Sequence, residues 1–318
     1  ILKIYDFPIF FFPKFSHPDP SVDRSSGFLA PSLSNNTTLG SGFATPYFLN
    51  IGRDKDLTIT PKFYFNENPV LLAEYRQDFI NSFLVVDTSY NQGYRKKNNK
   101  KSDGNRAHFF SNLFINFFDE KERTANLEIN VEKVSNDTYL KVHDINTTLV
   151  NKDKTILENK LDYVYQYKDF FFGLSPSVFE DTSKLGHLRH EYLLPLTIEK
   201  NIMSSEKYGS LDLGSNLRFR SYETNKKTNL LVNNFNWKSN NWFNSTGIEN
   251  YFEGLVKMVN YDAKNTSEFK NEKTNSEAHS ALGYFAKLRL YKEDLINKNF
   301  YSLTPKLLLR YAPGHMRK

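Results

Sequence analysis

Apolar and polar residues alternate one by one along most of this chain. Between residues 56 and 65 the odd positions are Leu57, Ile59, Pro61, Phe63 and Phe65, and the even positions are polar or tyrosine. The same period of two recurs at 127–132, 211–220, 282–290 and 301–311. Successive side chains of a β-strand point to opposite faces, so this period predicts strands. We therefore expect an all-β protein with few helices.

The alternating segments are long and are separated by polar turn clusters. They run about 9–13 residues, against the ~5–6 that is usual in soluble sheets, and we count roughly 15 or 16 of them. Lengths of about 9–11 suit a tilted strand that crosses a bilayer. Alternation by itself does not separate a soluble sandwich from a membrane barrel, because a barrel with a polar lumen inverts the same pattern. Strand length, strand number and aromatic residues near strand ends favour the barrel.

Composition narrows the possible classes further. The 318 residues contain no run near the roughly 18 apolar residues of a membrane helix, which excludes helical membrane proteins. Cysteine is absent, so the chain has no disulfide, no thiolate metal site and no cysteine nucleophile. The net charge of +6 is spread along the chain apart from the basic run at 96–101, and no nucleic-acid-binding module accompanies it. We expect no nucleic-acid partner.

No motif predicts catalysis or a cofactor. His187 and His190 are spaced i, i+3, whereas a zinc-binding helix needs i, i+4 to place both imidazoles on one face. Acidic pairs such as Asp119-Glu120 fall at strand ends, and neither a phosphate loop nor a Gly-x-Ser-x-Gly elbow occurs. The sequence predicts no enzyme, no metal and no cofactor.

Several phrases resemble the LptD family of outer-membrane lipopolysaccharide-assembly proteins. Each phrase is weak alone, but they follow the family's order from one end of the chain to the other. The phrases are Phe7-Pro8-Ile9-Phe10-Phe11-Phe12-Pro13, Arg24-Ser25-Ser26-Gly27-Phe28-Leu29-Ala30-Pro31, Pro46-Tyr47-Phe48-Leu49-Asn50-Ile51, Asp54 to Pro61, Ala73-Glu74-Tyr75-Arg76, Leu303-Thr304-Pro305-Lys306 and Arg310 to Gly314.

The resemblance implies a partial transmembrane antiparallel β-barrel with a short remnant of a periplasmic β-jelly-roll. We expect residues 1–22 to form the edge of the jelly roll and residues 23–318 to form an incomplete barrel. The junction would contain Phe7, Pro8, Phe11, Phe12 and Pro13. Both ends would then lie inside a longer protein. Family members often carry disulfides between these two parts, and this chain has no cysteine to form them.

The resemblance also implies a function. Lipopolysaccharide would be inserted into the outer leaflet of the bacterial outer membrane through a lateral gate between the first and last barrel strands. Pro31 and Pro46 fall at the family's gate positions, and a proline removes a ladder hydrogen bond and weakens an edge. Alternatively, Pro31 simply ends a strand and Pro46 begins a turn. The partner strand of the gate would lie beyond Lys318.

The implied partners are lipopolysaccharide, the plug lipoprotein LptE, the periplasmic bridge protein LptA and outer-membrane lipid. Arg76, Arg218, Arg220 and Arg289 alternate with apolar residues, which makes them candidates for side chains that face the lumen. There they would either pair with phosphates or keep the cavity wet. Two other functions remain open, a general outer-membrane channel or receptor barrel and a soluble glycan-binding β-sandwich.

Overall fold

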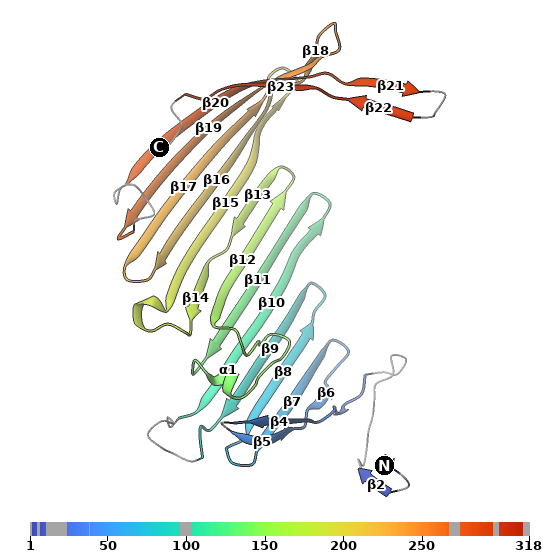
Figure 1. The fold of residues 1–318 in the computed structure, drawn as a ribbon, viewed down its shortest axis with the longest axis vertical. Helices are drawn as coiled ribbons and strands as arrows, with labels where there is room; N and C mark the ends of the chain where they lie inside the picture. The colour runs from blue at the N-terminus through green and yellow to red at the C-terminus, as the bar shows by residue number, and fades with distance from the viewer. Residues whose placement is uncertain are drawn as a thin grey trace. The chain divides into compact units, whose positions relative to one another are not determined.

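The protein is built almost entirely of β-strands (Figure 1). The computed structural model describes residues 2–4, 7–10, 24–37, 39–95, 104–266, 274–294 and 299–313. Within these ranges the helical segments are α1 (Tyr139–Val142) and the 3₁₀ turn η1 (Gly186–Leu188). No helix in the described part is long and apolar enough to cross a membrane. The all-β prediction is confirmed.

The chain divides into two compact units, which are treated separately here. Unit 1 comprises residues 1–116, 127–160 and 179–185, and unit 2 comprises 117–126, 161–178 and 186–318. The strands that lie wholly in unit 1 are β1 (Leu2–Ile4), β2 (Phe7–Phe10), β3 (Gly27–Phe28), β4 (Ser32–Asn36), β5 (Gly40–Ala44), β6 (Tyr47–Asn50), β7 (Lys55–Tyr64), β8 (Val70–Asp78) and β9 (Ser82–Asn91). Strands β10 (Arg106–Glu120), β11 (Arg123–Val134), β12 (Ile156–Tyr167) and β14 (Ser177–Asp181) contribute residues to both units.

At the N-terminus, β1 and β2 form a separate two-stranded antiparallel sheet. Phe7 and Pro8 lie in β2, where Phe7 is opposite Ile4 and Pro8 is opposite Lys3. The other predicted junction residues, Phe11, Phe12 and Pro13, lie outside the described residues. The assignment of this segment to a jelly roll stays a prediction.

The register of β7 to β10 gives each face of the unit 1 sheet a distinct chemistry. On one face, Asp56 is opposite Arg76, Glu74 is opposite Asp87, and Ser89 is opposite His108. The other face carries Leu57, Ile59, Pro61 and Phe63 of β7, Leu71 and Tyr75 of β8, Leu84 and Val86 of β9, and Phe109 and Leu113 of β10. The predicted alternation over residues 56–65 is confirmed.

Unit 2 consists mainly of a sheet with long antiparallel strands. Its strands are β13 (Phe170–Leu174), β15 (His190–Ser205), β16 (Gly209–Tyr222), β17 (Lys226–Lys238), β18 (Trp242–Phe243), β19 (Glu249–Lys264), β20 (Asn275–Lys287), β21 (Leu290–Asp294), β22 (Asn299–Leu303) and β23 (Lys306–Tyr311). Of these, β21 and β22 form a separate two-stranded sheet. Strands β15 and β19 have 16 residues each, enough to cross a bilayer at a tilt. Leu217 faces Leu196 and Leu231 across the sheet, as the predicted period of two requires.

Prolines divide several segments that the alternation predicts as single strands. The predicted segment 301–311 is interrupted at Thr304-Pro305, so that β22 pairs only with β21 while β23 pairs with β20. Pro31 likewise separates β3 from β4, and Pro46 separates β5 from β6. Proline has no N–H to donate to a ladder. These three divisions explain part of the difference between the 23 strands of the described ranges and the roughly 15 or 16 segments that the pattern predicts.

Candidate functional site

The apolar face of unit 1 is exposed and its polar face is buried. On the apolar face Leu71 is 50% exposed and Phe65 is 72% exposed, whereas on the polar face Asp87 is 1% and His108 is 2% exposed. A soluble sheet buries its apolar face, because removing apolar surface from water stabilises the fold. This sheet does the opposite, as expected where the apolar side chains contact lipid.

The polar face is covered by the connection between β11 and β12, which we call the covering segment (residues 135–155). It contains α1, whose Tyr139 is fully buried. Leu140, Ile145 and Val150 of this segment form one apolar cluster with Phe110 of β10. The sequence reasoning did not predict this packing. The signal was available, since these apolar residues stand in an otherwise polar connection.

A chain of hydrogen bonds fixes the covering segment to the sheet. The Asp87 carboxylate lies 2.7 Å from His108 Nε2, and His108 Nδ1 lies 2.5 Å from the Ser89 hydroxyl. The Ser89 hydroxyl in turn lies 2.8 Å from the Tyr139 hydroxyl of α1. A carboxylate can only accept, so Nε2 holds the proton of the first bond and Nδ1 is left to accept from Ser89. Ser89 can then accept from Tyr139.

This group contains the three residue types of a hydrolytic triad, but its surroundings differ from those of an active site. Ser89 is 3% exposed and its oxygen is already bonded to Tyr139, so no substrate carbonyl can approach it. The arrangement instead links four buried polar side chains and joins β9, β10 and α1. Its role is structural.

Two more polar contacts attach the same segment to β7. The Lys62 ammonium donates to the carbonyl oxygens of His143 and Asp144, at 2.7 and 3.2 Å. The Tyr64 hydroxyl donates to the same His143 carbonyl at 3.2 Å. Backbone carbonyls at the end of α1 are thereby satisfied, as buried carbonyls must be.

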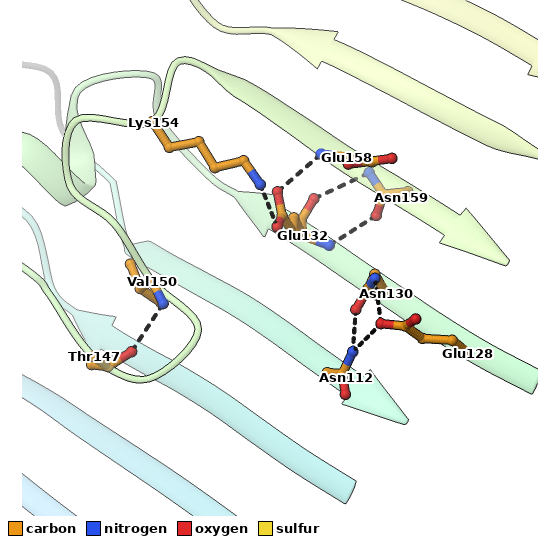
Figure 2. A network of polar contacts seen from close by, with 9 residues as sticks. All are labelled: Asn112, Glu128, Asn130, Glu132, Thr147, Val150, Lys154, Glu158 and Asn159. Carbon is orange, nitrogen blue, oxygen red and sulfur yellow. Dashed lines mark hydrogen bonds and ion pairs between the residues drawn. The ribbon is translucent and has the colours of Figure 1, made fainter. Parts of the chain in front are cut away.

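The polar face continues onto β11 and β12 (Figure 2). Figure 2 shows Asn112 of β10 donating to Glu128 and to Asn130 of β11, at 2.9 and 2.5 Å. Further along β11, Glu132 accepts from Lys154 at 2.6 Å and from the backbone N–H of Glu158 at 2.9 Å. Lys154 belongs to the covering segment. This segment is therefore bonded to β7 through Lys62 and to β11 through Glu132. The predicted alternation at 127–132 is confirmed, with Glu128, Asn130 and Glu132 on the polar face.

Burial, together with the nearby Arg106 and Lys62 charges, lowers the pKa of His143 to about 4, against an opposing effect of Glu67. The imidazole is 2% exposed, lies between the rings of Tyr139 and Tyr64, and has no hydrogen-bond partner at either nitrogen. The docked segment therefore holds a neutral imidazole. When the segment detaches, this pKa returns to about 6.5.

We expect the covering segment to loosen as the pH falls from about 6.5 to 4. The detached state binds a proton in that window and the docked state does not, so docking loses about 2 kcal/mol by pH 5. Amide hydrogen exchange should show protection factors for residues 139–145 that fall roughly thirtyfold between pH 7.5 and 5. A His143→Phe variant keeps the ring contacts and removes the titration, so its protection should stay level. An equal fall in that variant would contradict the assignment.

Three of the four arginines proposed for the lumen are held by carboxylate partners. Arg76 lies on the polar face of unit 1 and bonds to buried Asp56 at 2.8 Å, and Arg24 reaches the other oxygen of that carboxylate at 3.4 Å. In unit 2, Arg220 contacts both carboxylate oxygens of Glu191, at 2.6 and 3.3 Å. Arg289 lies 3.5 Å from Glu249. Arg218 shares the Arg220 face of β16 and is exposed.

The two proposed gate prolines lie at neighbouring strand interruptions, Pro31 between β3 and β4 and Pro46 between β5 and β6. Pro46 accepts a hydrogen bond from the Leu29 N–H at 2.9 Å. Pro31 follows two residues later and is exposed. Leu29 and Phe28 on the same strand are 41% and 55% exposed, so apolar side chains flank the prolines.

Among the described residues, no group of three or more His, Asp or Glu side chains could hold a metal ion. His187 lies in η1 and His190 begins β15. The two histidines therefore do not share a helix face.

The exposed apolar face, the covered polar face and the long antiparallel strands together define the class of outer-membrane β-strand proteins. Within that class the chain is similar to the LPS-assembly protein LptD of several bacteria. It is 29% identical to that of Nitrosococcus oceani over 174 residues, which are 52% of this chain and 21% of the relative. It is 26% identical to that of Legionella pneumophila over 54% of this chain and 21% of the relative, and 39% identical to that of Shewanella oneidensis over 75 residues, or 24% and 10%. No protein-family model matches the chain.

The matched part thus spans about a fifth of the length of the first two relatives. The sequence resemblance to LptD is confirmed over about half of this chain.

Proposed function

We propose that this chain is part of a protein that inserts lipopolysaccharide into the outer leaflet of the outer membrane. The single observation that carries the proposal is the inverted unit 1 sheet, with lipid-compatible side chains outside and a covered polar face, in a chain similar to LPS-assembly proteins. The activity is transport and needs no catalytic residue. We further propose that the lipid chains leave through a lateral gate at the N-terminal strands, where Pro31 and Pro46 lie.

The structure of these strands supports a gate at this place. Between β3 and β6 only two residue pairs are formed, Gly27 with Phe48 and Phe28 with Tyr47. Pro46 cannot return the hydrogen bond that its carbonyl accepts from Leu29. An edge with so few ladder bonds is deformed at a low energetic cost, which weakens the side of the gate that these strands form.

The covered polar face of unit 1 disfavours an open channel, and its exposed apolar face disfavours a soluble sandwich. An open channel needs a free water path, but here Tyr139, Leu140 and Ile145 pack onto the polar face of β9 and β10. A soluble sandwich would leave Leu71, Phe65 and Phe109 in contact with water. We propose LptE and LptA as partners of the complete protein, as the resemblance to LptD implies.

In-cell photo-crosslinking tests the proposal. A photoreactive residue at Leu29 or Phe48 should form adducts with lipopolysaccharide that disappear when transport is stopped. The control is Leu71, which is 50% exposed on the same kind of face but lies on β8. Its adducts, if formed, should not depend on ongoing transport. Absence of adducts at Leu29 and Phe48 in protein that reaches the outer membrane would overturn the gate and favour an ordinary channel.

A further inference from the structure

A third proline, Pro61 of β7, lies at the same level of the sheet as Pro31 and Pro46. The registers of β5 and β6 against β7 are continuous, with Ala44 opposite Lys62 and Tyr47 opposite Ile59. Thr45 is therefore opposite Pro61. The Thr45 N–H donates to the Pro61 carbonyl at 3.2 Å. In an antiparallel pair of this kind the second residue returns the bond, but Pro61 has no N–H to return it.

The ladder on the other side of Thr45 is interrupted as well. Phe28 is opposite Tyr47 and Ser32 is opposite Ala44, so the pairing shifts by one residue between them. Ala30 and Pro31 together oppose Thr45, which is a β-bulge. Pro46 also lacks the N–H that would donate to Leu29. Three missing donors and one bulge thus form a line across three neighbouring strands, which we call the proline crease (Pro31, Pro46 and Pro61).

The crease divides the N-terminal hairpin into two parts that are held differently. Below it, β3 and β6 are anchored by polar bonds: Arg24 reaches Asp56, and the Asn50 N–H donates to the Ser26 hydroxyl at 2.9 Å. Above it, β4 and β5 form a hairpin of five residue pairs, the arm (Figure 1), and β5 pairs with the end of β7 at three positions. The side-chain bonds within this arm are long, at 3.5 Å for Ser34 to Gly42 and for Ser41 to Asn35.

The arm is seated by the buried side chains of Leu39 and Ala44 and by one glycine. Leu39, at its turn, is 1% exposed and forms an apolar cluster with Tyr64 and Val70. Val142 of α1 packs against that cluster. At Gly42 the strand approaches β7 so closely that a Cβ atom would lie 2.5 Å from the Phe63 carbonyl oxygen. Outside this seat the arm exposes Leu33, at 90%.

We propose that the β4–β5 arm is a flap that turns about the proline crease while β3 and β6 stay in place, and that Leu39 latches it in the closed position. The inference rests on the proposed function, because the moving flap would widen the N-terminal edge of the gate. It adds Pro61 as a third hinge residue. It also connects the gate to the covering segment, since the cluster that receives Leu39 includes contacts from α1.

Two matched bridges test the flap. The Phe43–Phe63 pair lies above the crease and the Leu49–Leu57 pair lies below it; both join β7 to the preceding strand on the apolar face. Each pair is replaced by cysteines in the complete protein and bridged by oxidation or by a short bis-methanethiosulfonate reagent. This chain has no cysteine of its own. The upper bridge should block the arrival of new lipopolysaccharide at the surface until a reductant is added, and the lower bridge should not.

Equal transport with both bridges, or equal block by both, would overturn the flap. Hydrogen exchange gives a second readout that does not depend on transport. A Leu39→Asp variant should speed the exchange of amides in 40–44 at least tenfold and leave those in 56–60 unchanged. If depletion of the protein does not slow lipopolysaccharide arrival, the proposed function fails, and this exchange pattern alone then decides whether the flap exists.

Discussion

Replacing His108 with leucine should lower the free energy of unfolding of the β9–β10 region by roughly 3–5 kcal/mol. The imidazole is the partner of Asp87, which is 1% exposed, and the second oxygen of that carboxylate has no hydrogen bond. Loss of the His108 imidazole leaves the buried Asp87 carboxylate without a partner and removes the acceptor for the Ser89 hydroxyl. Hydrogen exchange of β9, β10 and α1 in the purified, detergent-solubilised protein measures the effect.

Two control variants separate this cost from the general effect of a histidine substitution. His279 lies 3.5 Å from Glu277 with both side chains partly exposed, so His279→Leu should change stability by less than about 1 kcal/mol. The double variant Asp87→Leu/His108→Leu removes both partners and should recover more than half of the loss, because replacing a buried pair by apolar groups is often neutral. A double variant no better than the single one would show that the pair is not the source of the cost.

The alternation of residues predicts which side chain faces which side of the sheet, and it does so reliably here because the period of a strand is a steric property of the backbone. It predicts neither which face meets lipid nor what lies over the polar face. Both depend on contacts between residues far apart in sequence, such as Ser89 with Tyr139 and Lys62 with His143. Asp56 shows the same limit, since its pairing with Arg76 and Arg24 depends on the register of three strands.

The prolines show how far sequence reasoning reaches at the site. Pro31 and Pro46 can be singled out by resemblance, and their lack of an N–H is a covalent fact. Pro61 falls on the apolar face of an otherwise regular alternation, so the pattern treats it as one more apolar residue. Its importance follows only from the register that sets it opposite Thr45. Which of its two neighbouring strands a proline weakens is not encoded in the local sequence.

Replacing both Pro31 and Pro46 with threonine should slow the arrival of lipopolysaccharide at the cell surface by roughly two- to tenfold. Each threonine supplies an N–H, and at position 46 that donor faces the Leu29 carbonyl across the ladder. A restored ladder bond contributes about 0.5–1.5 kcal/mol, so the bond at position 46 raises the cost of deforming this edge by about that amount. If deformation of this edge limits transport, an added cost of about 1.4 kcal/mol slows transport tenfold.

A proline far from the gate provides the matched control. Pro195 lies inside β15 opposite Arg218, and its carbonyl accepts from the Ser175 N–H at 3.1 Å, so it too leaves one ladder bond unreturned. Pro195→Thr restores a bond of the same kind at a place where no opening is proposed, and surface arrival of pulse-labelled lipopolysaccharide should remain at the unmodified rate. An equal slowing in both variants would mean that general rigidity of the strands limits transport. Unchanged arrival in the double variant, with normal amounts in the outer membrane, would remove Pro31 and Pro46 from the gate. Slowing by the double variant alone would locate the rate-limiting opening at the strands that these two prolines weaken.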